Sequence, residues 1–342
     1  MKPLFYSDYL EGAHQRILDA LQATNLEQTP GYGEDIYCDK ARKLIKEACC
    51  APEADVHFLV GGTQANATVI NSILRPYQGV LCAGTGHIAV HETGAIEHGG
   101  HKVLPLEPTD GKITAEQIRT AVKEHYGNSN FEHTVQPGMV YISFPTELGT
   151  IYSRSELEQI SQACHDCSIP LFIDGARLGY GLTCKANDLS LPDFARLADI
   201  FYIGGTKQGA LFGEAVVINN DALKPCFRYN IKQNGGMFAK GRLLGIQFAE
   251  FFTNNLYFDI ALNANRQAEK IKDALKAKGY ELYGSSPTNQ VFVVVNETGM
   301  ARLDESIGFE YWERLDAERS VIRICTSWCT SDEAVDILLK AL

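Results

Sequence analysis

The sequence lacks any run of positive charge and any long apolar segment. Its 342 residues carry 31 Lys and Arg against 42 Asp and Glu, which gives a formal net charge of −11. An acidic chain without a basic cluster argues against nucleic acid or an anionic membrane as the main partner. No stretch approaches the ~18 consecutive apolar residues of a transmembrane helix, and residues 1–16 lack the apolar core of a signal peptide. We therefore expect a cytoplasmic protein.

The ten cysteines do not form the pattern of a disulfide framework or a zinc site. They are scattered through apolar and helical segments, which is typical of reduced thiols in a cytoplasm. Cys164 and Cys167 have the spacing of half a zinc site, but a second pair at matching spacing is missing. We predict no metal centre and interpret the two cysteines as thiols at the end of a helix.

Helical and strand patterns alternate between about residues 40 and 220. Apolar runs typical of strands lie at 54–60, 79–84, 138–144, 169–175, 198–205 and 213–220. Amphipathic segments typical of helices lie at 39–49, 63–75, 115–127 and 154–167. This order predicts an α/β fold whose mainly parallel sheet is covered on both faces. Ligands of such sheets bind beyond the carboxyl ends of the strands.

The chain changes character after about residue 245. A long amphipathic helix is predicted at 266–283, followed by a strand at 290–295 and by the segments 320–330 and 331–342. We therefore predict two domains: a large α/β domain over residues 1–245, with the N-terminal segment, and a smaller α+β domain over 246–342.

Two of the predicted strand ends carry residues suited to an anion and to a positive charge. After the strand at 54–60, Gly62 and Thr63 form a turn that opens a helix, where backbone N–H groups bind phosphate. Asp174 ends the apolar strand at 169–175, and a carboxylate there is costly to bury without a positive partner. That partner is either Arg177, in a structural ion pair, or a protonated ring nitrogen of a ligand.

A third strand end carries His87, and a fourth carries a single lysine. His87 precedes Glu92 by five positions; its ring either makes ordinary hydrogen bonds or stacks on a flat ligand. Lys207 lies in "GGTKQGA", between two apolar runs. A lysine amine in a low-dielectric pocket loses its proton more easily and becomes nucleophilic toward carbonyls. A phosphate-binding turn, a carboxylate for a ring nitrogen, a stacking aromatic ring and a nucleophilic lysine together describe a pyridoxal 5′-phosphate site.

With these residues in view, the chain resembles the threonine aldolase and β-eliminating lyase group of fold-type I pyridoxal-phosphate enzymes. The resemblance covers nearly the whole length. The matching segments are "GYGEDIYCDKA", "GGTQANATVI", "GHIAVHETGA", "FIDGARL", "GGTKQGALFGEAVV", "KQNGGMFAKGRLL" and "IRICTSW". It implies a large domain like that of fold-type I pyridoxal-phosphate transferases, plus the small C-terminal domain.

The resemblance also implies roles for individual residues. Lys207 would bond covalently to the cofactor, Asp174 would hold its ring nitrogen and His87 would stack on its ring. The phosphate would be held by Gly62, Thr63 and Thr206. The substrate α-carboxylate would be bound by Arg177 and Arg323 with help from Ser7, because the planar fork of arginine suits a bidentate contact.

By the same resemblance, Tyr37 matches a tyrosine that the family sends into the neighbouring subunit's site. This implies a homodimer or homotetramer with shared active sites. For Arg323 an ordinary alternative is a buried ion pair with a nearby acid such as Asp332.

The chain departs from the family pattern at two places. Where members often carry a histidine that meets the substrate hydroxyl, this chain has Glu147, and His91 is a candidate substitute. The alternatives are a loop glutamate that points at solvent and a histidine on a helix surface. The family's arginine after "GGM" is replaced by Phe238, with Lys240 and Arg242 nearby, which leaves open what neutralises the phosphate.

Three functions follow from this site, in order of preference. The first is a lyase that cleaves the Cα–Cβ bond of a β-hydroxy amino acid, giving glycine and an aldehyde. The second is an enzyme that uses the same cofactor but eliminates a β-substituent or acts on another amino acid. The third is a non-catalytic ligand-binding protein that retains the fold.

Overall fold

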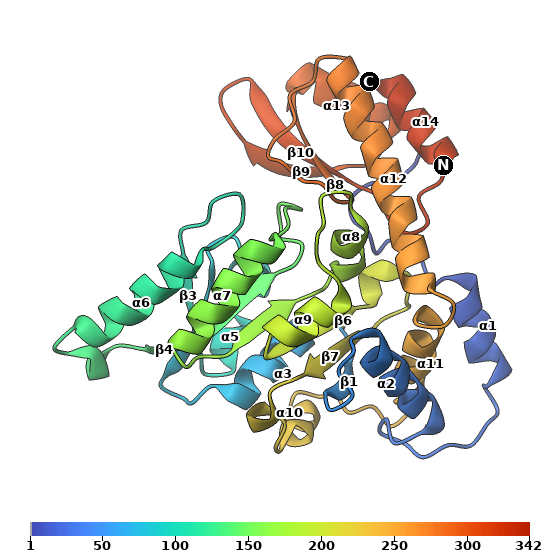
Figure 1. Ribbon diagram of the computed structural model, residues 1–342. Coiled ribbons are helices and arrows are strands. Elements are labelled where there is room, and N and C mark those ends of the chain that lie inside the picture. The colour runs from blue at the N-terminus through green and yellow to red at the C-terminus, as the bar shows by residue number, and fades with distance from the viewer. Residues whose placement is uncertain (1) are drawn as a thin grey trace.

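A seven-stranded sheet forms the centre of the computed structural model, which describes residues 2–342 (Figure 1). The strands are β1 (Asp55–Leu59), β2 (Gln78–Ala83), β3 (Lys102–Leu106), β4 (Gln136–Ser143), β5 (Leu171–Asp174), β6 (Ile200–Gly204) and β7 (Glu214–Ile218). Their order is β1-β7-β6-β5-β4-β2-β3. Only β7 pairs antiparallel with its neighbours β1 and β6, and the other pairs are parallel. The predicted mainly parallel sheet is confirmed.

Helices cover both faces of this sheet, because alternate strand residues point to opposite sides. In β4, Val140 and Ile142 pack into one core, and Met139 and Tyr141 into the other. The first core is closed by α1 (Gln15–Ala23), α2 (Ile36–Ala48), α6 (Ala115–Gly127), α7 (Arg154–Asp166), α9 (Leu191–Leu197) and α11 (Arg242–Phe251). The second is closed by α3 (Gly62–Ile73), α5 (Ala95–His98) and α10 (Phe227–Gln233).

A second, smaller layer lies above the large sheet in Figure 1. Its three-stranded antiparallel sheet has the order β8-β10-β9, formed by β8 (Gln290–Asn296), β9 (Glu310–Arg314) and β10 (Arg319–Cys325). The helices around it are α12 (Leu256–Ala277), α13 (Glu297–Ser306) and α14 (Asp332–Ala341). The start of the chain joins this layer, since Phe5 packs in its core and its N–H donates to the Gly308 carbonyl at 2.7 Å.

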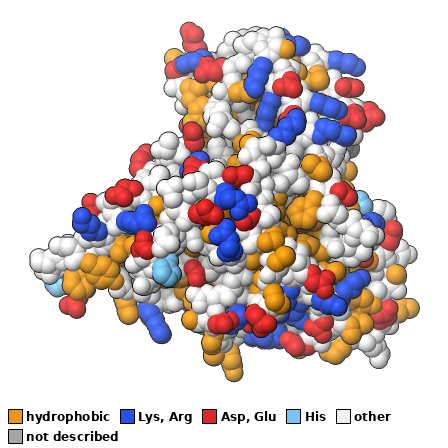
Figure 2. All heavy atoms as spheres, viewed as in Figure 1, with side chains coloured by type: hydrophobic (Ala, Val, Ile, Leu, Met, Phe, Trp, Pro, Cys, Tyr) orange, Lys and Arg blue, Asp and Glu red, His pale blue; other side chains and the backbone are white. Residues whose placement is uncertain are grey.

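Within residues 2–342, none of the helices combines the length and apolar character that a membrane span requires. Figure 2 shows acidic and basic side chains intermingled over the face in view.

Candidate active site

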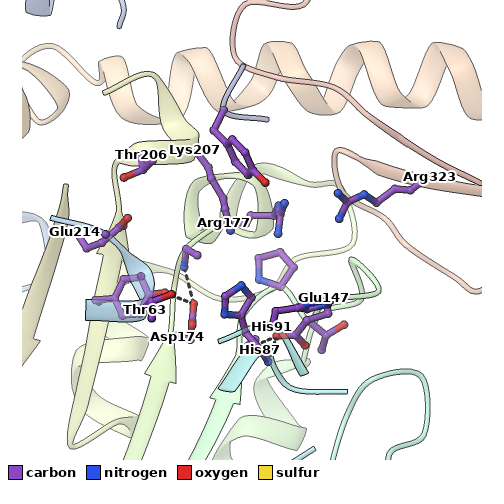
Figure 3. A pocket seen from close by; sticks show the side chains of 18 of the residues that line it. Thr63, His87, His91, Glu147, Asp174, Arg177, Thr206, Lys207, Glu214 and Arg323 are labelled. Atoms are coloured by element: carbon purple, nitrogen blue, oxygen red, sulfur yellow. Dashed lines mark hydrogen bonds between the residues drawn. The ribbon is translucent and has the colours of Figure 1, made fainter. Parts of the chain in front are cut away.

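A cavity of about 520 Å³ opens at the carboxyl ends of the parallel strands, where the strand pattern predicts a ligand (Figure 3). Loops after β4, β5 and β6 form its floor, and Glu310, Trp312 and Arg323 bring the small sheet to its wall. The predicted site residues that line the cavity are Gly62, Thr63, His87, His91, Glu147, Asp174, Arg177, Thr206, Lys207 and Arg323.

Lys207 lies on a single 3₁₀ turn, Thr206–Gln208, directly after β6. The next glycine, Gly209, has φ = 92°, a left-handed conformation that turns the chain away from the cavity. Burial lowers the pKa of Lys207, and the positive charge of Arg177 lowers it further. Lys207 makes no ion pair within residues 2–342, because Asp8 is engaged by Arg177 and Asp174 by hydroxyl and amide donors. Its amine is therefore suited to act as a neutral nucleophile.

Asp174 ends β5 and is 4% exposed. Its carboxylate accepts hydrogen bonds from the Tyr141 hydroxyl (2.6 Å), the Tyr202 hydroxyl, the Asn66 amide (3.1 Å) and the Ala176 N–H (2.9 Å). Burial raises its pKa, but the charge of His87 and these hydrogen bonds outweigh burial and leave the pKa below its usual value. The alternative of an ion pair with Arg177 is wrong, since Arg177 contacts another carboxylate.

His87 begins the short helix α4 (His87–Val90) and belongs to the same network. Its Nδ1 lies 2.8 Å from Glu92 Oε1, which also accepts from the Asn66 amide at 2.7 Å. Because Asn66 also donates to Asp174, a chain of hydrogen bonds joins the imidazole to the aspartate. The network fixes the His87 ring at the cavity wall.

The glycine turn at 61–63 is a cradle of free N–H groups. It begins α3, whose first N–H groups have no partner within the helix. A Cβ at Gly62 would lie 3.1 Å from the Tyr202 hydroxyl, so the glycine keeps the backbone close to the cavity floor. Thr206 faces the same region and accepts a hydrogen bond from the Gly213 N–H at 3.0 Å. Such a cradle suits a phosphate group.

Two arginines reach the cavity, and each has an internal acidic partner. Arg177 donates from Nε and Nη2 to Asp8 at 2.7 and 3.0 Å. Arg323 donates from Nη2 to Glu310, and from Nη1 to Gln290 at 3.1 Å.

The alternative expectation of an ion pair between Arg323 and a nearby acid is therefore met by Glu310; the acid named for it, Asp332, pairs with Lys270 instead. The buried Nε–H of Arg323 has no partner within residues 2–342.

Glu147 points into the cavity and not toward bulk solvent, so the solvent alternative is wrong. It accepts hydrogen bonds from the Ser143 hydroxyl at 2.6 Å and from the His87 N–H at 2.8 Å. Burial is the main cause of its raised pKa. His91 follows at the end of α4, with its ring centroid 5.6 Å from that of His87. Burial, followed by the neighbouring His87, lowers the pKa of His91.

Several predicted residues lie outside this cavity. Ser7 is buried but does not line it, and Tyr37 donates to Glu27 at the surface. Arg242 donates to the carbonyls of Glu27 and Asn25 at 2.9 and 3.1 Å, and Phe238 packs near Phe212. Neither Lys240 nor Arg242 lines the cavity. The role of Ser7 at the substrate carboxylate stays a prediction, and so do the roles of Tyr37 and of Lys240 or Arg242 in a neighbouring subunit.

Sequence reasoning missed residues that complete the site: Asp8, Asn66, Tyr141, Tyr202, Glu214, Glu310 and Trp312. The two tyrosines carried a signal, since each is a polar group inside an otherwise apolar strand and requires a partner. Asp8 carried none, because only the tertiary fold brings it to Arg177, 169 positions away. Glu310 carried none, because its contact with Arg323 depends on the pairing of β9, which has no apolar run, with β10.

The residues present fit pyridoxal phosphate as a set. The cradle at Gly62, Thr63 and Thr206 suits its phosphate, the buried Asp174 carboxylate suits a protonated ring nitrogen, and Lys207 suits its carbonyl. The three groups line one cavity, with Asp174, Thr63 and Thr206 on the same side in Figure 3.

Comparison with known proteins agrees with this chemistry. The family model described as β-eliminating lyase matches residues 5–298. The chain belongs to the β-eliminating lyase family. It is 28% identical to the low specificity L-threonine aldolase of Pseudomonas sp. (strain NCIMB 10558), over 97% of this chain and 94% of that protein.

Two solved structures share the fold. One is described as a threonine aldolase from Leishmania major, with 44% identity, a TM-score of 0.96, and coverage of 99% of this chain and 98% of that chain. The other, described as a putative L-allo-threonine aldolase from Listeria monocytogenes, is 18% identical, with a TM-score of 0.75 and coverage of 98% and 95%. The fold is that of fold-type I pyridoxal-phosphate enzymes, so the predicted fold, family and cofactor are confirmed. The protein is a pyridoxal-phosphate-dependent lyase.

Proposed function

We propose that this β-eliminating lyase cleaves the Cα–Cβ bond of a threonine-like β-hydroxy amino acid, releasing glycine and an aldehyde. The observation that carries the proposal is the arrangement of Lys207, Asp174 and Glu147 around one cavity that also receives two arginines. The 44% identity with a protein described as a threonine aldolase, over nearly both whole chains, supports it.

The roles of the binding residues follow from their chemistry. Gly62, Thr63 and Thr206 hold the phosphate, and His87, fixed through Glu92, packs against the ring. Arg177 and Arg323 hold the substrate α-carboxylate. Both arginines line the cavity, and the planar fork of a guanidinium suits a carboxylate.

Each reacting group has its own role in the proposed reaction. Pyridoxal phosphate, when bound, supplies an electron sink for the charge that develops at Cα. Asp174 remains ionised and holds a proton at the ring nitrogen. Lys207 would hold the cofactor until the substrate amine takes its place; the released amine would then accept a proton and deliver it to Cα. Glu147 or His91 takes the proton of the β-hydroxyl group.

A second candidate is elimination of a β-substituent by the same site. It is favoured by one observation: a carboxyl group, Glu147, stands where the family often has a histidine. This departure changes the side chain that contacts the β-substituent. In the competing reaction the enzyme would release that β-substituent instead of an aldehyde.

We also propose a homodimer or homotetramer working in the cytoplasm. Tyr37 does not line its own chain's cavity, in keeping with a role in a neighbouring one. Large apolar side chains are exposed around the N-terminal segment, with Leu26 at 92% and Ile36 at 67%. All ten cysteines are free, which suits a reducing compartment. The division at residue 245 remains a prediction.

The deciding experiment is incubation of the holoenzyme with a panel of β-hydroxy and other β-substituted amino acids. Glycine plus aldehyde is expected as the product, measured against ammonia plus keto acid. Lys207→Ala should abolish turnover and the visible absorbance of the lysine-bound cofactor, whereas Lys43→Ala, on an exposed face of α2, should change neither. Formation of ammonia and keto acid alone would overturn the proposal.

A further inference from the structure

Glu214 is a buried acid in the active-site cavity that the mechanism above does not use. Its exposed fraction is 3%, and it is the first residue of β7. In the sheet register it is paired with Leu59, the last residue of β1, and with Gly204, the last residue of β6. It therefore lies between the two strand ends from which the phosphate-binding loops emerge.

This register places the carboxyl group inside the proposed phosphate cradle. The chain after Leu59 runs into Gly62 and Thr63, and the chain after Gly204 runs into Thr206. In Figure 3 Glu214 lies beside Thr206 and on the same side of the cavity as Thr63, away from Arg323. Gly62, Thr63, Thr206 and Glu214 all line the cavity.

One carboxyl oxygen of Glu214 is already engaged. Oε2 accepts a hydrogen bond from the Gly205 N–H at 3.1 Å, and the Thr206 side chain is also within hydrogen-bonding reach of the carboxyl group. An ionised carboxylate in this cradle would repel a phosphate dianion, whereas a protonated carboxyl group would donate to it. The chain has Phe238 where the family has an arginine, so a neutral donor would fill a gap in the cradle.

We propose that Glu214 is protonated in the cofactor-loaded enzyme and donates a hydrogen bond to the cofactor phosphate. This proposal rests on the phosphate cradle proposed above. Glu214 is thus a positioning and affinity residue for the cofactor.

The electrostatic environment agrees with this geometry. The titratable groups that face Glu214 are Lys207 after β6, Asp174 on β5, Tyr202 on β6 and Tyr257 on α12. Burial raises the pKa of Glu214 to about 8, despite the opposing effects of Thr206, Lys207 and the Gly205 N–H. A phosphate dianion raises that pKa further, so the acid is neutral near pH 7 and ionises only in alkaline solution.

The test compares cofactor binding by wild type, Glu214→Gln and Glu214→Ala at about pH 7 and about pH 10. Gln has the hydrogen-bonding pattern of a protonated Glu but cannot ionise, so it should match wild type at neutral pH and bind more tightly at alkaline pH. Ala lacks the donor and should weaken binding by roughly 10- to 100-fold, the range expected for a hydrogen bond to a charged group. With pyridoxal, which has no phosphate, the differences should vanish.

Glu250→Gln is the matched control, since it makes the same change at a partly buried glutamate outside the cavity and should leave phosphate affinity unaltered. In the wild-type holoenzyme, the ³¹P resonance of the bound cofactor should shift in the alkaline range, and Glu214→Gln should abolish that shift. A flat wild-type resonance overturns the proposal, as does tighter binding by Glu214→Gln at pH 7 itself, which would show an ionised Glu214. These readouts do not depend on which amino acid is cleaved, so failure of the proposed reaction would leave them unchanged.

Discussion

Arg177 forms a two-point ion pair with Asp8, a residue 169 positions earlier in the chain, with N–O distances of 2.7 and 3.0 Å. Asp8 also accepts a hydrogen bond from Asn289 at 3.0 Å, just before β8. The pair thus connects the N-terminal segment to the loop after β5 of the large sheet and, through Asn289, to the small sheet. It holds the Arg177 guanidinium at the cavity wall, where the substrate carboxylate is proposed to bind.

We predict that Asp8→Asn lowers the free energy of unfolding by about 3–5 kcal/mol at neutral pH, because it leaves Arg177 buried without its partner. Urea denaturation of the cofactor-loaded enzyme measures this. Asp304→Asn, which breaks the exposed pair with Lys2, is the control and should change stability little.

The same prediction has a pH dependence. Burial raises the pKa of Asp8, but Arg177 and Lys207 outweigh burial and leave the pKa below 3.8. The stabilisation is therefore complete well above pH 3.8 and is lost as the pH falls through the lower folded-state pKa. The gap between wild type and Asp8→Asn should narrow in acid; a gap that is constant with pH would exclude the ion pair as its cause.

Asp174→Asn should keep the cofactor bound but lower the turnover rate by at least about tenfold, equivalent to ~1.4 kcal/mol in the barrier. An amide cannot hold the ring nitrogen in its protonated form, and so the electron sink weakens. Rates of single turnover and the spectrum of bound cofactor measure the two effects separately. Asp199→Asn is a suitable control, because Asp199 accepts from the Leu171 N–H at the opposite end of β5. Normal turnover in Asp174→Asn would reduce Asp174 to a structural role.

Arg323 and Glu310 should affect substrate binding in opposite directions. Arg323→Lys keeps the charge but loses the planar fork, so KM should rise strongly while the cofactor spectrum stays unchanged. Glu310→Gln removes a carboxylate that competes for the same guanidinium, so KM should fall. The matched control is Glu281→Gln, which removes a carboxylate from the exposed ion pair with Arg319 and should leave KM unchanged. Equal KM values in wild type and Glu310→Gln would show that the substrate carboxylate does not meet Arg323.

The sequence predicted the parts of the site that depend on local pattern. Helix α6 has the predicted bounds, 115–127. Asp174 and Lys207 were found because Asp174 ends one apolar strand and Lys207 lies in the turn that follows the next. Strand β9, "EYWER", was missed because its side chains are mostly exposed or half-buried and show no apolar run. The partners Asp8 and Glu310 and the position of Glu214 depend on strand register and on contacts between distant segments, which no local pattern encodes.

The last prediction concerns the base that takes the β-hydroxyl proton. Burial raises the pKa of Glu147 toward the range useful for a general base near neutral pH. Burial, followed by the neighbouring His87, lowers the pKa of His91, so its imidazole is neutral near pH 7 and able to accept a proton. Cleavage by a Glu147 base should increase with pH as that raised pKa is passed, because only the carboxylate accepts a proton. Glu147→Gln should remove this pH dependence and slow cleavage at least about tenfold.

His91→Asn is made in parallel, and each variant is also assayed for exchange of the Cα proton of glycine. Because glycine has no β-hydroxyl group, a base that serves only that group should be dispensable for exchange. Slower cleavage with normal exchange in one variant identifies the base. Loss of both activities in Glu147→Gln would instead indicate that the carboxyl group positions His87, whose N–H it accepts at 2.8 Å. If neither variant slows cleavage tenfold, neither residue is the base, and the proton must leave to water or to the cofactor phosphate.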